Sequence, residues 1–305
     1  MNTVVVVAGP TASGKSDIAL DLAEFFGGEI VNCDSVQLYR YMDIGTAKTP
    51  VSQRRGIPHH LIDILDPDDI FTAGDYQRNG RAALAEIASR GRLPVVVGGT
   101  GFYLRALLHG LFDGPARNDE LRARLARRKP GSLHRLLSHF DPVAASHIHA
   151  HDTNKLIRAL EVRLLTRQPI TSLYAHNREP LQGFRVLQIG LDPPRDQLAR
   201  QIDERCARMY LDGLVTEVQQ IVAMGYSRDA KSLQSIGYRE AMACLDGKMS
   251  MTEALERTQA ATRQYAKRQR TWFRRDPDIT WFQAFGNQLE TSEAIKRHVG
   301  ARLNR

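Results

Sequence analysis

Alternating apolar and polar positions divide the first third of the chain into strand–helix units. Residues 4–8 form a wholly apolar run, which is typical of a strand buried on both faces. Apolar residues then recur at helical spacing over residues 18–26, where Gly27 ends the predicted helix. Residues 29–33 and 94–97 predict two further strands, separated by a helix over about residues 73–90. Repeated units of this kind predict a parallel sheet with right-handed crossovers.

The pattern changes near Gly114. Residues 117–176 show helical periodicity, many charges and no convincing strand, and residues 186–191 then predict a return strand. The remainder of the chain is predicted to be mostly helical. We therefore expect an α/β core formed by residues 1–113 and 186–305, interrupted by an all-helical insertion domain over residues 114–185.

Composition excludes several classes of protein. Apolar residues make up 42% of the 305 positions and charged residues 25%, as in a globular protein. No apolar stretch approaches the roughly 18–20 residues of a membrane-spanning helix, and the first residues lack the basic flank of a secretion signal. The three cysteines lie far apart, without zinc-site spacing. We expect a reduced protein of the cytoplasm.

The positive charge of the chain is concentrated near its C-terminal end. Lysine and arginine exceed aspartate and glutamate by 42 to 34, giving a net charge of +8. The segment RQYAKRQRTWFRR, residues 263–275, contains six cations and no carboxylate. Such clustering favours a polyanionic partner.

A helix is predicted to carry this basic segment, because Ser250 and Glu253 have the spacing of a capping box. One face of that helix would present Arg263, Lys267, Arg270 and Arg274. We expect this face to bind a phosphate backbone; an ordinary solvated helix face is the alternative. Trp272 and Phe273 favour core anchoring over base stacking.

The segment GPTASGKS follows the first predicted strand and opens the first predicted helix. It matches G-x-x-x-x-G-K-[ST] in the strand–turn–helix context that a phosphate-binding loop requires, and so predicts a P-loop NTPase-like sheet flanked by helices. Backbone N–H groups and the helix N-terminus would face a phosphate. Lys15 would pair with the terminal phosphate, and the Ser16 hydroxyl would ligate Mg²⁺. The predicted phosphate-binding residues are Gly9, Pro10, Thr11, Ala12, Ser13, Gly14, Lys15 and Ser16.

No carboxylate stands where a nucleoside triphosphatase usually has one. The strand over residues 94–97 runs into the segment GGTG rather than into an acidic residue. Asp34 instead follows the second strand, and in a parallel sheet such strand ends line the crevice beside the phosphate loop. We predict a catalytic or metal-binding role for Asp34; capping of a turn is the alternative.

The chain contains, in this order, GPTASGKS, DSVQLYRYMDIGTAK, PHHLIDILDP, VVVGGTGFYL, SIGYRE and KRQRTWFRR. Together these blocks resemble the tRNA dimethylallyltransferase (tRNA isopentenyltransferase) family in its bacterial form. The phosphate loop alone is not specific, whereas DSVQ, GGTGFYL and SIGYR together are. The resemblance runs from Gly9 to Arg275 and covers nearly the whole chain. Eukaryotic members carry a C-terminal zinc finger, which this sequence does not show.

The resemblance implies transfer of a dimethylallyl group from dimethylallyl diphosphate to N6 of the adenosine at tRNA position 37. Asp34 would take the proton of the amino group. Lys15, the loop amides and Mg²⁺ on Ser16 would stabilise the leaving diphosphate. Arg205 and Thr100 match family positions at the donor phosphates. A surface ion pair is the alternative for Arg205, and a helix cap for Thr100.

The resemblance also implies a large tRNA interface. Ser35 and Gln37 would contact an extruded adenine, and Gln37 can bond its Watson–Crick edge. The helical insertion would clasp the anticodon loop, although its charges also suit a solvated surface. The implied tRNA-binding residues are Asp34, Ser35, Val36, Gln37, Thr100, Arg158, Gln234, Ser235, Ile236, Gly237, Tyr238, Arg239, Lys267, Arg268, Arg270 and Arg274.

Three other functions compete with this interpretation. A small-molecule kinase would use the phosphate loop and a helical lid but leave the basic segment without a role. A non-catalytic RNA-binding protein would need no intact Lys15, Ser16 and Asp34. An isopentenyltransferase acting on free adenine nucleotides would need neither the insertion nor the basic helix. The transferase acting on tRNA accounts for all of these features, and we expect it to be a monomer.

Overall fold

The computed structural model describes residues 1–112, 114–174 and 179–303. The chain forms two compact units, one of Met1–Leu107 with Gln182–Arg305 and the other of Leu108–Leu181. The second unit begins and ends before the bounds expected from the sequence, 114 and 185. Its two ends pair with each other, because the Leu181 amide donates to the Leu108 carbonyl at 2.8 Å.

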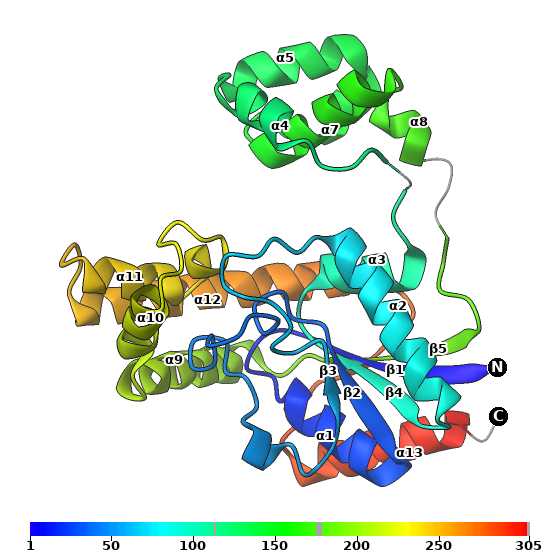
Figure 1. The fold of residues 1–305 in the computed structure, drawn as a ribbon. Helices are drawn as coiled ribbons and strands as arrows, with labels where there is room; N and C mark the ends of the chain where they lie inside the picture. The colour runs from blue at the N-terminus through cyan, green and yellow to red at the C-terminus, as the bar shows by residue number, and fades with distance from the viewer. Residues whose placement is uncertain (113, 175–178, 304–305) are drawn as a thin grey trace. The chain divides into compact units, whose positions relative to one another are not determined.

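The first unit is built on a six-stranded sheet with the order β3-β2-β4-β1-β5-β6 (Figure 1). The strands are β1 (Asn2–Ala8), β2 (Gly28–Asn32), β3 (His59–His60), β4 (Leu93–Val97), β5 (Phe184–Leu191) and β6 (Ile279–Phe282). Each described strand pair is parallel. Val5 of β1 lies opposite Val95 of β4 and Leu187 of β5. The segments that follow β1, β2 and β4 therefore emerge at one edge of the sheet.

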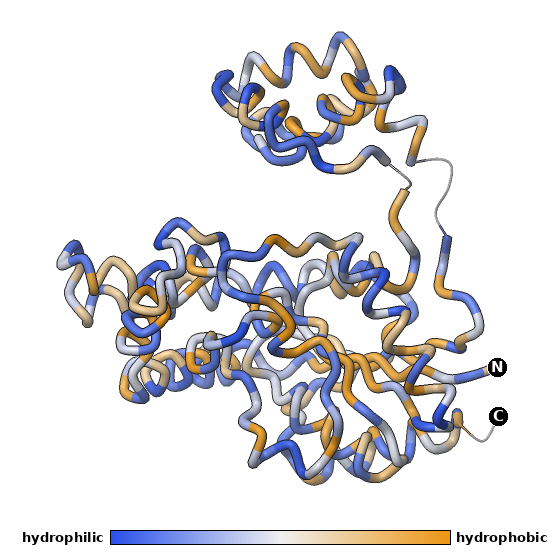
Figure 2. Tube along the Cα trace, in the orientation of Figure 1, coloured by the Kyte–Doolittle hydropathy of each residue, from blue (hydrophilic) through white to orange (hydrophobic). Residues whose placement is uncertain are grey.

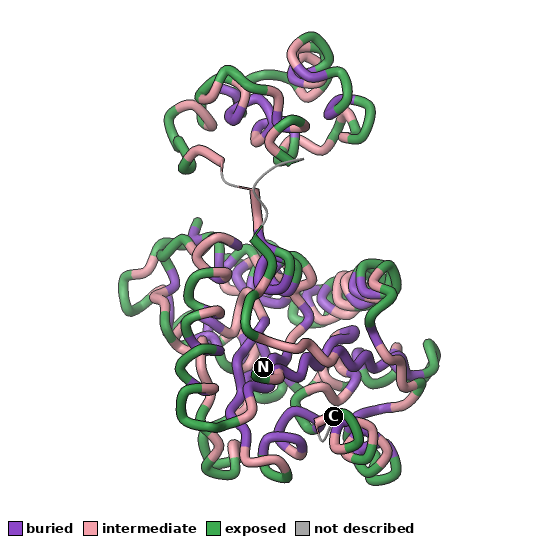
Figure 3. The backbone as a smooth tube through the Cα atoms, turned by 90° about the vertical axis from the view of Figure 1, so that its right-hand side faces the viewer, coloured by how far each residue is buried: buried purple, intermediate pink, exposed green. Residues whose placement is uncertain are grey.

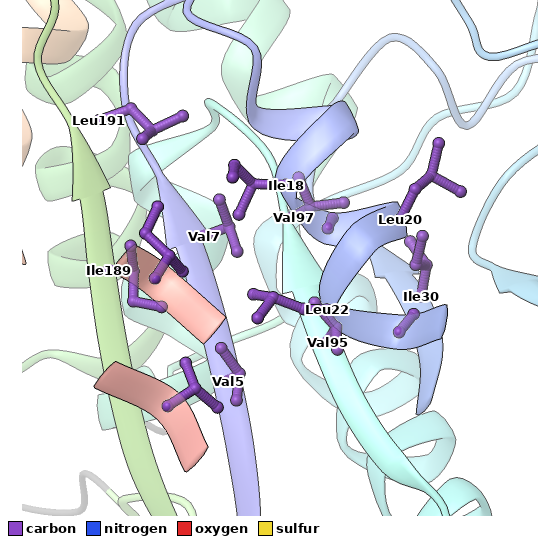
Figure 4. Close-up of a cluster of buried hydrophobic side chains, with 14 residues drawn as sticks. Val5, Val7, Ile18, Leu20, Leu22, Ile30, Val95, Val97, Ile189 and Leu191 are labelled. Carbon is purple, nitrogen blue, oxygen red and sulfur yellow. The ribbon is translucent and has the colours of Figure 1, made fainter. Parts of the chain in front are cut away.

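The central strands of this sheet consist largely of apolar residues, as the hydropathy colouring of the backbone shows (Figure 2). Val5 and Val7 pack with residues of α1 (Lys15–Phe26), and α13 (Leu289–Leu303) adds Ile295 and Val299 to the same cluster (Figure 4). Alternation along the strand turns the fully buried Val4 and Val6 toward the other face. There α2 (Ala73–Ser89) contacts β2 and β4, and α3 (Gly101–His109) follows β4.

Four helices form a second layer of the first unit. They are α9 (Arg195–Leu211), α10 (Leu214–Ala223), α11 (Tyr238–Leu245) and α12 (Met251–Phe273). Their shared core includes Tyr210, Leu214, Val218 and Tyr238, and Met42 from the segment after β2 joins it. Two 3₁₀ turns, Val51–Gln53 and Ser232–Gln234, complete the first unit. Figure 3 shows buried positions running through this unit, with exposed positions on its outer surfaces.

The second unit has a hydrophobic core of its own. Its helices are α4 (Asp119–Ala126), α5 (Pro130–Phe140), α6 (Pro142–His147), α7 (Thr153–Thr166) and α8 (Ile170–Tyr174). Leu133 and Leu137 of α5 pack with Leu156 and Leu160 of α7, and all four side chains are fully buried. The unit thus consists of helices over its described residues, as predicted, while the predicted helical end at His176 lies outside them.

The structure confirms the parallel sheet flanked by helices. The capping boxes at Thr72 and Ser250 begin α2 and α12, and Gly27 ends α1 in the left-handed conformation. Sequence periodicity did not find β3 and β6, because two and four residues are too short to establish an alternation. No helix among the described residues is long and apolar enough to cross a membrane.

Candidate active site

The phosphate-binding loop lies between β1 and α1, at the carboxyl edge of the sheet. Gly14 caps α1 with φ +81°, and a Cβ there would lie 2.7 Å from the Gly286 amide nitrogen, so no larger residue fits. The buried Ser13 hydroxyl donates to the Pro10 carbonyl at 2.9 Å. The Ser13 carbonyl accepts from the Gly286 amide, also at 2.9 Å. The path of the loop is therefore fixed by contacts inside the protein.

Lys15 begins α1 and turns its ammonium back into the loop. Its Nζ donates to the Pro10 carbonyl at 2.5 Å. Burial, with the nearby positive charge of Arg205, lowers the pKa of Lys15 to about 7, and Asp34 opposes this shift. An ammonium this poorly solvated is stabilised by an anion at the loop.

A buried glutamine connects this loop to the segment after β4. Gln269 of α12 accepts from the Thr11 amide at 2.8 Å and donates to the Gly99 carbonyl at 2.9 Å. Its side chain uses both the acceptor and the donor of its amide. This residue is not predicted from the sequence, where the only signal is an uncharged glutamine within a run of cations.

Asp34 follows β2, and one of its carboxylate oxygens accepts hydrogen bonds from backbone amides of the next turn. Its Oδ1 accepts from the amides of Val36 at 2.9 Å and Gln37 at 3.4 Å. Its Oδ2 has no hydrogen bond to any residue that the structure describes. The capping role and a chemical role are therefore compatible, because they use different oxygens of one carboxylate.

Thr100 links the segment after β4 to the segment after β2. Its hydroxyl oxygen accepts from the Ser35 amide at 3.0 Å and lies 3.3 Å from the Ser35 hydroxyl. This contact, rather than a cap of α3, occupies the Thr100 side chain. It holds Asp34 and its turn beside the phosphate-binding loop.

Arg205 of α9 spans two walls of the site. Its guanidinium donates to the Thr11 hydroxyl at 3.1 Å and to the Thr46 carbonyl at 3.4 Å. Burial lowers its pKa from the ordinary arginine value, against the pull of Asp34. Arg205 is therefore not a surface ion pair. It is a second half-buried cation near Lys15.

Some of these groups line one cavity of about 330 Å³, within the range of small-ligand sites. Lys15, Thr100 and the predicted Gln37 are not among its lining residues. Residues from five separate parts of the chain line it, including Thr11, Asp34, Thr46, Arg205, Ser235 and Arg268. Ser35, Val36, Gln234 and Ile236 complete the predicted residues that the cavity brings together. Tyr265 and Arg268 line it from α12, and the Arg268 guanidinium lies 5.7 Å from the centre of the Tyr265 ring.

The predicted cationic face of α12 does not line this cavity. Arg263, Lys267, Arg270 and Arg274 share one face, as predicted, and border a groove of about 310 Å³ against α9. Arg270 and Arg274 both pair with the buried Asp192, at 2.7 and 2.6 Å, and Arg263 pairs with Asp203. Sequence analysis considered only acidic residues within the tract, whereas these carboxylates come from other elements. Lys267 remains exposed.

Three other predicted tRNA-binding side chains have structural partners. Tyr238 is fully buried, and its hydroxyl donates to Glu217 at 2.5 Å, so its side chain presents no surface to an RNA. Arg158 lies in the helical unit, where it pairs with the buried Glu161 at 2.7 Å and donates to the Pro115 carbonyl. Arg239 is exposed at the start of α11, although it pairs with Glu240, and Gly237 is the buried cap of that helix.

The donor set at the loop suits a magnesium ion that is bound mainly by a phosphorylated substrate. Among the described residues no group of three or more histidine, cysteine or acidic side chains is arranged to hold a metal. The exposed Ser16 lies in the first turn of α1 and makes no hydrogen bond through its hydroxyl to any described residue. Magnesium commonly takes few protein ligands together with waters and phosphate oxygens, and Ser16 can supply one.

The fold and the site define a P-loop protein whose cavity suits an anionic ligand. Residues 37–276 match the IPP transferase family, and the chain belongs to this family. The tRNA dimethylallyltransferase of Solibacter usitatus is 54% identical to it over 97% of both chains. The crystal structure of a tRNA isopentenylpyrophosphate transferase from Bacillus halodurans has a TM-score of 0.74 at 37% identity, covering 100% of this chain and 97% of its own. A eukaryotic dimethylallyltransferase acting on tRNA has a TM-score of 0.85 at 27% identity, covering 100% and 80%.

Binding of inorganic diphosphate should draw a proton onto Lys15. With a pKa of about 7 the free amine is largely neutral at higher pH, and a bound anion favours its charged form. Lys15 should contribute about one proton of uptake per ligand near pH ~8 and almost none near pH ~6, in addition to any proton that the diphosphate itself gains or loses. Calorimetry in two buffers of different ionisation enthalpy measures this uptake. Lys15→Arg is the control, because its guanidinium stays charged while the ligand is unchanged; equal uptake by both proteins would contradict the assignment.

Proposed function

We propose that this protein transfers a dimethylallyl group from dimethylallyl diphosphate to N6 of adenosine 37 in tRNA, releasing diphosphate. The observation that carries the proposal is the arrangement of Lys15 and Arg205 beside Asp34, at a phosphate-binding loop without the carboxylate of a triphosphatase. A diphosphate supplies the missing negative charge and needs no activated water. Relatives named as tRNA dimethylallyltransferases support the choice of donor and acceptor.

The diphosphate end of the reaction is served by the loop. As the bond between the allylic carbon and the diphosphate oxygen breaks, negative charge grows on the leaving group. Arg205 lines the cavity where that charge would form, and Lys15, whose ammonium donates to the Pro10 carbonyl, lies in the adjoining loop, so both cations would offset it. Mg²⁺, when bound, would neutralise part of the same charge. Ser16 would hold it, together with oxygens of the substrate.

The acceptor end is served by Asp34. The adenine amino group is a weak nucleophile because its lone pair is delocalised into the ring. As its nitrogen forms the new bond to carbon, it must lose a proton, and Asp34 Oδ2 accepts it. The proton then passes to solvent when the product leaves. Since Oδ1 continues to accept from Val36 and Gln37, the carboxylate keeps its orientation throughout.

Recognition of adenine falls to the turn after β2. The side-chain nitrogen Nε2 of Gln37 donates to the Thr46 carbonyl at 3.1 Å. The side-chain oxygen of Gln37 can therefore still accept a hydrogen bond from a base. The Ser35 hydroxyl lies at the cavity wall beside Thr100. An adenine in an anticodon loop reaches these groups by leaving its stack, which costs little in a single strand.

The tRNA backbone requires cations outside the cavity. Arg239 and Lys267 are exposed away from the cavity lining, whereas the exposed Gln234 and Arg268 lie at the cavity wall; all four suit contacts with phosphates. The helical unit would contact the anticodon stem–loop through its basic surface. We propose that the protein acts in the cytoplasm as a monomer.

The proposal is tested by incubating the protein with Mg²⁺, labelled dimethylallyl diphosphate and unmodified tRNA, with AMP and ATP as parallel acceptors. Label in tRNA, lost when adenosine 37 is replaced by guanosine, is the expected result. Label in AMP or ATP alone would show that the acceptor is a free nucleotide and not tRNA. ATP consumption without transfer would indicate a small-molecule kinase and overturn the proposal.

Asp34→Asn should lower kcat about 10²–10⁴-fold, the usual contribution of a general base. The amide oxygen can still accept from the Val36 and Gln37 amides, so the turn and the affinity for tRNA should persist. Single-turnover transfer and filter binding measure the two effects separately. If the affinity for tRNA fell by as much as kcat, the assignment of Asp34 as the general base would be contradicted.

Replacing both Lys267 and Arg268 by alanine should weaken tRNA binding and reduce the salt dependence of its affinity. Each phosphate contact contributes a slope of about 0.7–0.9 in log affinity against log salt. Arg270→Ala is the matched control, because this cation is already paired with the buried Asp192. It should lower the thermal midpoint of unfolding and leave the slope unchanged. An equal change of the salt slope in both variants would indicate that Arg270 also contacts tRNA phosphates.

A further inference from the structure

The segment from Met42 to Lys48 forms one wall of the cavity, and its Thr46 carbonyl serves two partners. It accepts from Gln37 Nε2 at 3.1 Å and from Arg205 Nη2 at 3.4 Å. Gln37 belongs to the proposed adenine site, and Arg205 to the diphosphate site. A single backbone atom therefore orients one side chain for each substrate.

A buried carboxylate of α10 holds this segment in place. Glu217 Oε2 accepts from the Asp43 amide at 3.0 Å and the Ile44 amide at 2.8 Å, and its Oε1 lies 3.4 Å from the Gly45 amide. Only 8% of Glu217 is exposed, so these bonds are strong and costly to lose. Glu217 does not line the cavity itself. Its influence on the site passes through the segment.

Tyr238 completes the support from α11. Its hydroxyl donates to Glu217 Oε1 at 2.5 Å, and burial raises its pKa well above the ordinary value, which keeps it a donor. Its ring packs on Gly45, where an added Cβ would lie 2.4 Å from a ring carbon. The fully buried ring thus fixes how closely the segment approaches α11. This contact accounts for the tyrosine of the SIGYRE block without any contact to RNA.

The far end of the segment is held independently. Lys48 is buried and pairs with Asp43 and Asp63, each at 2.6 Å. The ion pairs fix where the segment ends, whereas Glu217 and Tyr238 fix the part that precedes Thr46, from Asp43 to Gly45. Loss of the Glu217 contacts would therefore shift the Thr46 carbonyl while the segment stays attached.

We propose that Glu217, braced by Tyr238, is a positioning residue for both substrates, acting through the Thr46 carbonyl on Arg205 and Gln37. The part that concerns adenine rests on the proposed function. The part that concerns Arg205 does not, because any diphosphate ligand of the loop would depend on it.

Glu217→Gln tests the proposal, since the substituted amide turns its nitrogen toward backbone N–H groups or toward the Tyr238 hydroxyl. We expect affinity for inorganic diphosphate, measured by calorimetry, to fall about tenfold. The KM values for dimethylallyl diphosphate and for tRNA should both rise by a similar factor. Tyr238→Phe retains the three amide bonds and should give a smaller change in the same direction.

Glu29→Gln is the matched control. Glu29 is a buried carboxylate of β2 whose partners, His60 and Arg90, lie outside the cavity. It should lower the thermal midpoint of unfolding and leave diphosphate affinity unchanged. If Glu217→Gln only lowers the midpoint as Glu29→Gln does, the positioning role is overturned. If Glu217→Gln does not fold, the same comparison is made with Tyr238→Phe.

The two proposals fail in distinguishable ways. A wild-type protein that binds diphosphate but transfers nothing to tRNA would contradict the proposed function. Calorimetry of Glu217→Gln would still decide whether Glu217 positions Arg205. A rise in the KM for tRNA without any change in diphosphate affinity would contradict the shared role of the Thr46 carbonyl.

Discussion

The site depends on two half-buried cations, Lys15 and Arg205, held near one carboxylate. Removing Lys15 and Arg205 from water disfavours their charged forms, and Asp34 offsets only part of this cost. The fold stability of the surrounding elements must therefore hold an electrostatically unfavourable arrangement until an anion binds. An anion would favour the charged form of Lys15 and offset the charge of Arg205, whereas a neutral molecule of the same size would do neither.

Three neighbouring side chains of helix α12 point in different directions and make different contacts. Gln269 bridges the phosphate-binding loop and the Gly99 carbonyl, Arg268 faces the cavity, and Arg270 pairs with Asp192 near α9. Because the turns after β1 and β4 lie side by side, one glutamine can satisfy both. The basic composition of the helix is thus divided between internal ion pairs and exposed cations. Counting charges along the sequence does not separate the two groups.

Much of the fold could be predicted from the sequence because its signals are local. Buried strands such as residues 4–8, the loop ending in Lys15 and Ser16, and the capping box at Ser250 each lie within a few residues of chain. The position of Asp34 at a strand end followed from the parallel sheet alone. Glu217 and Gln269 could not be predicted in this way, because each acts on backbone atoms more than 160 residues away.

The predicted tRNA contacts and the structure diverge where a predicted side chain has a partner inside the protein. Tyr238 and Arg270 lie within blocks that carry the family resemblance, yet the structure gives them partners inside the protein. A sequence block that resembles the family contains residues at the surface and also buried residues that hold this surface in place. Helical spacing shows which residues share a face, but the identity of the neighbouring element requires tertiary structure.

The polar contacts that shape the cavity run mainly from side chains to backbone atoms. Asp34 binds the Val36 amide, Thr100 binds the Ser35 amide, and Arg205 binds the Thr46 carbonyl. A substitution removes the side chain of such a pair, but its backbone partner moves only when the loop moves. The geometry of the site is consequently set by the paths of a few loops at the carboxyl edge of the sheet. Residues that fix those paths, such as Glu217, therefore govern the chemistry without touching the reacting atoms.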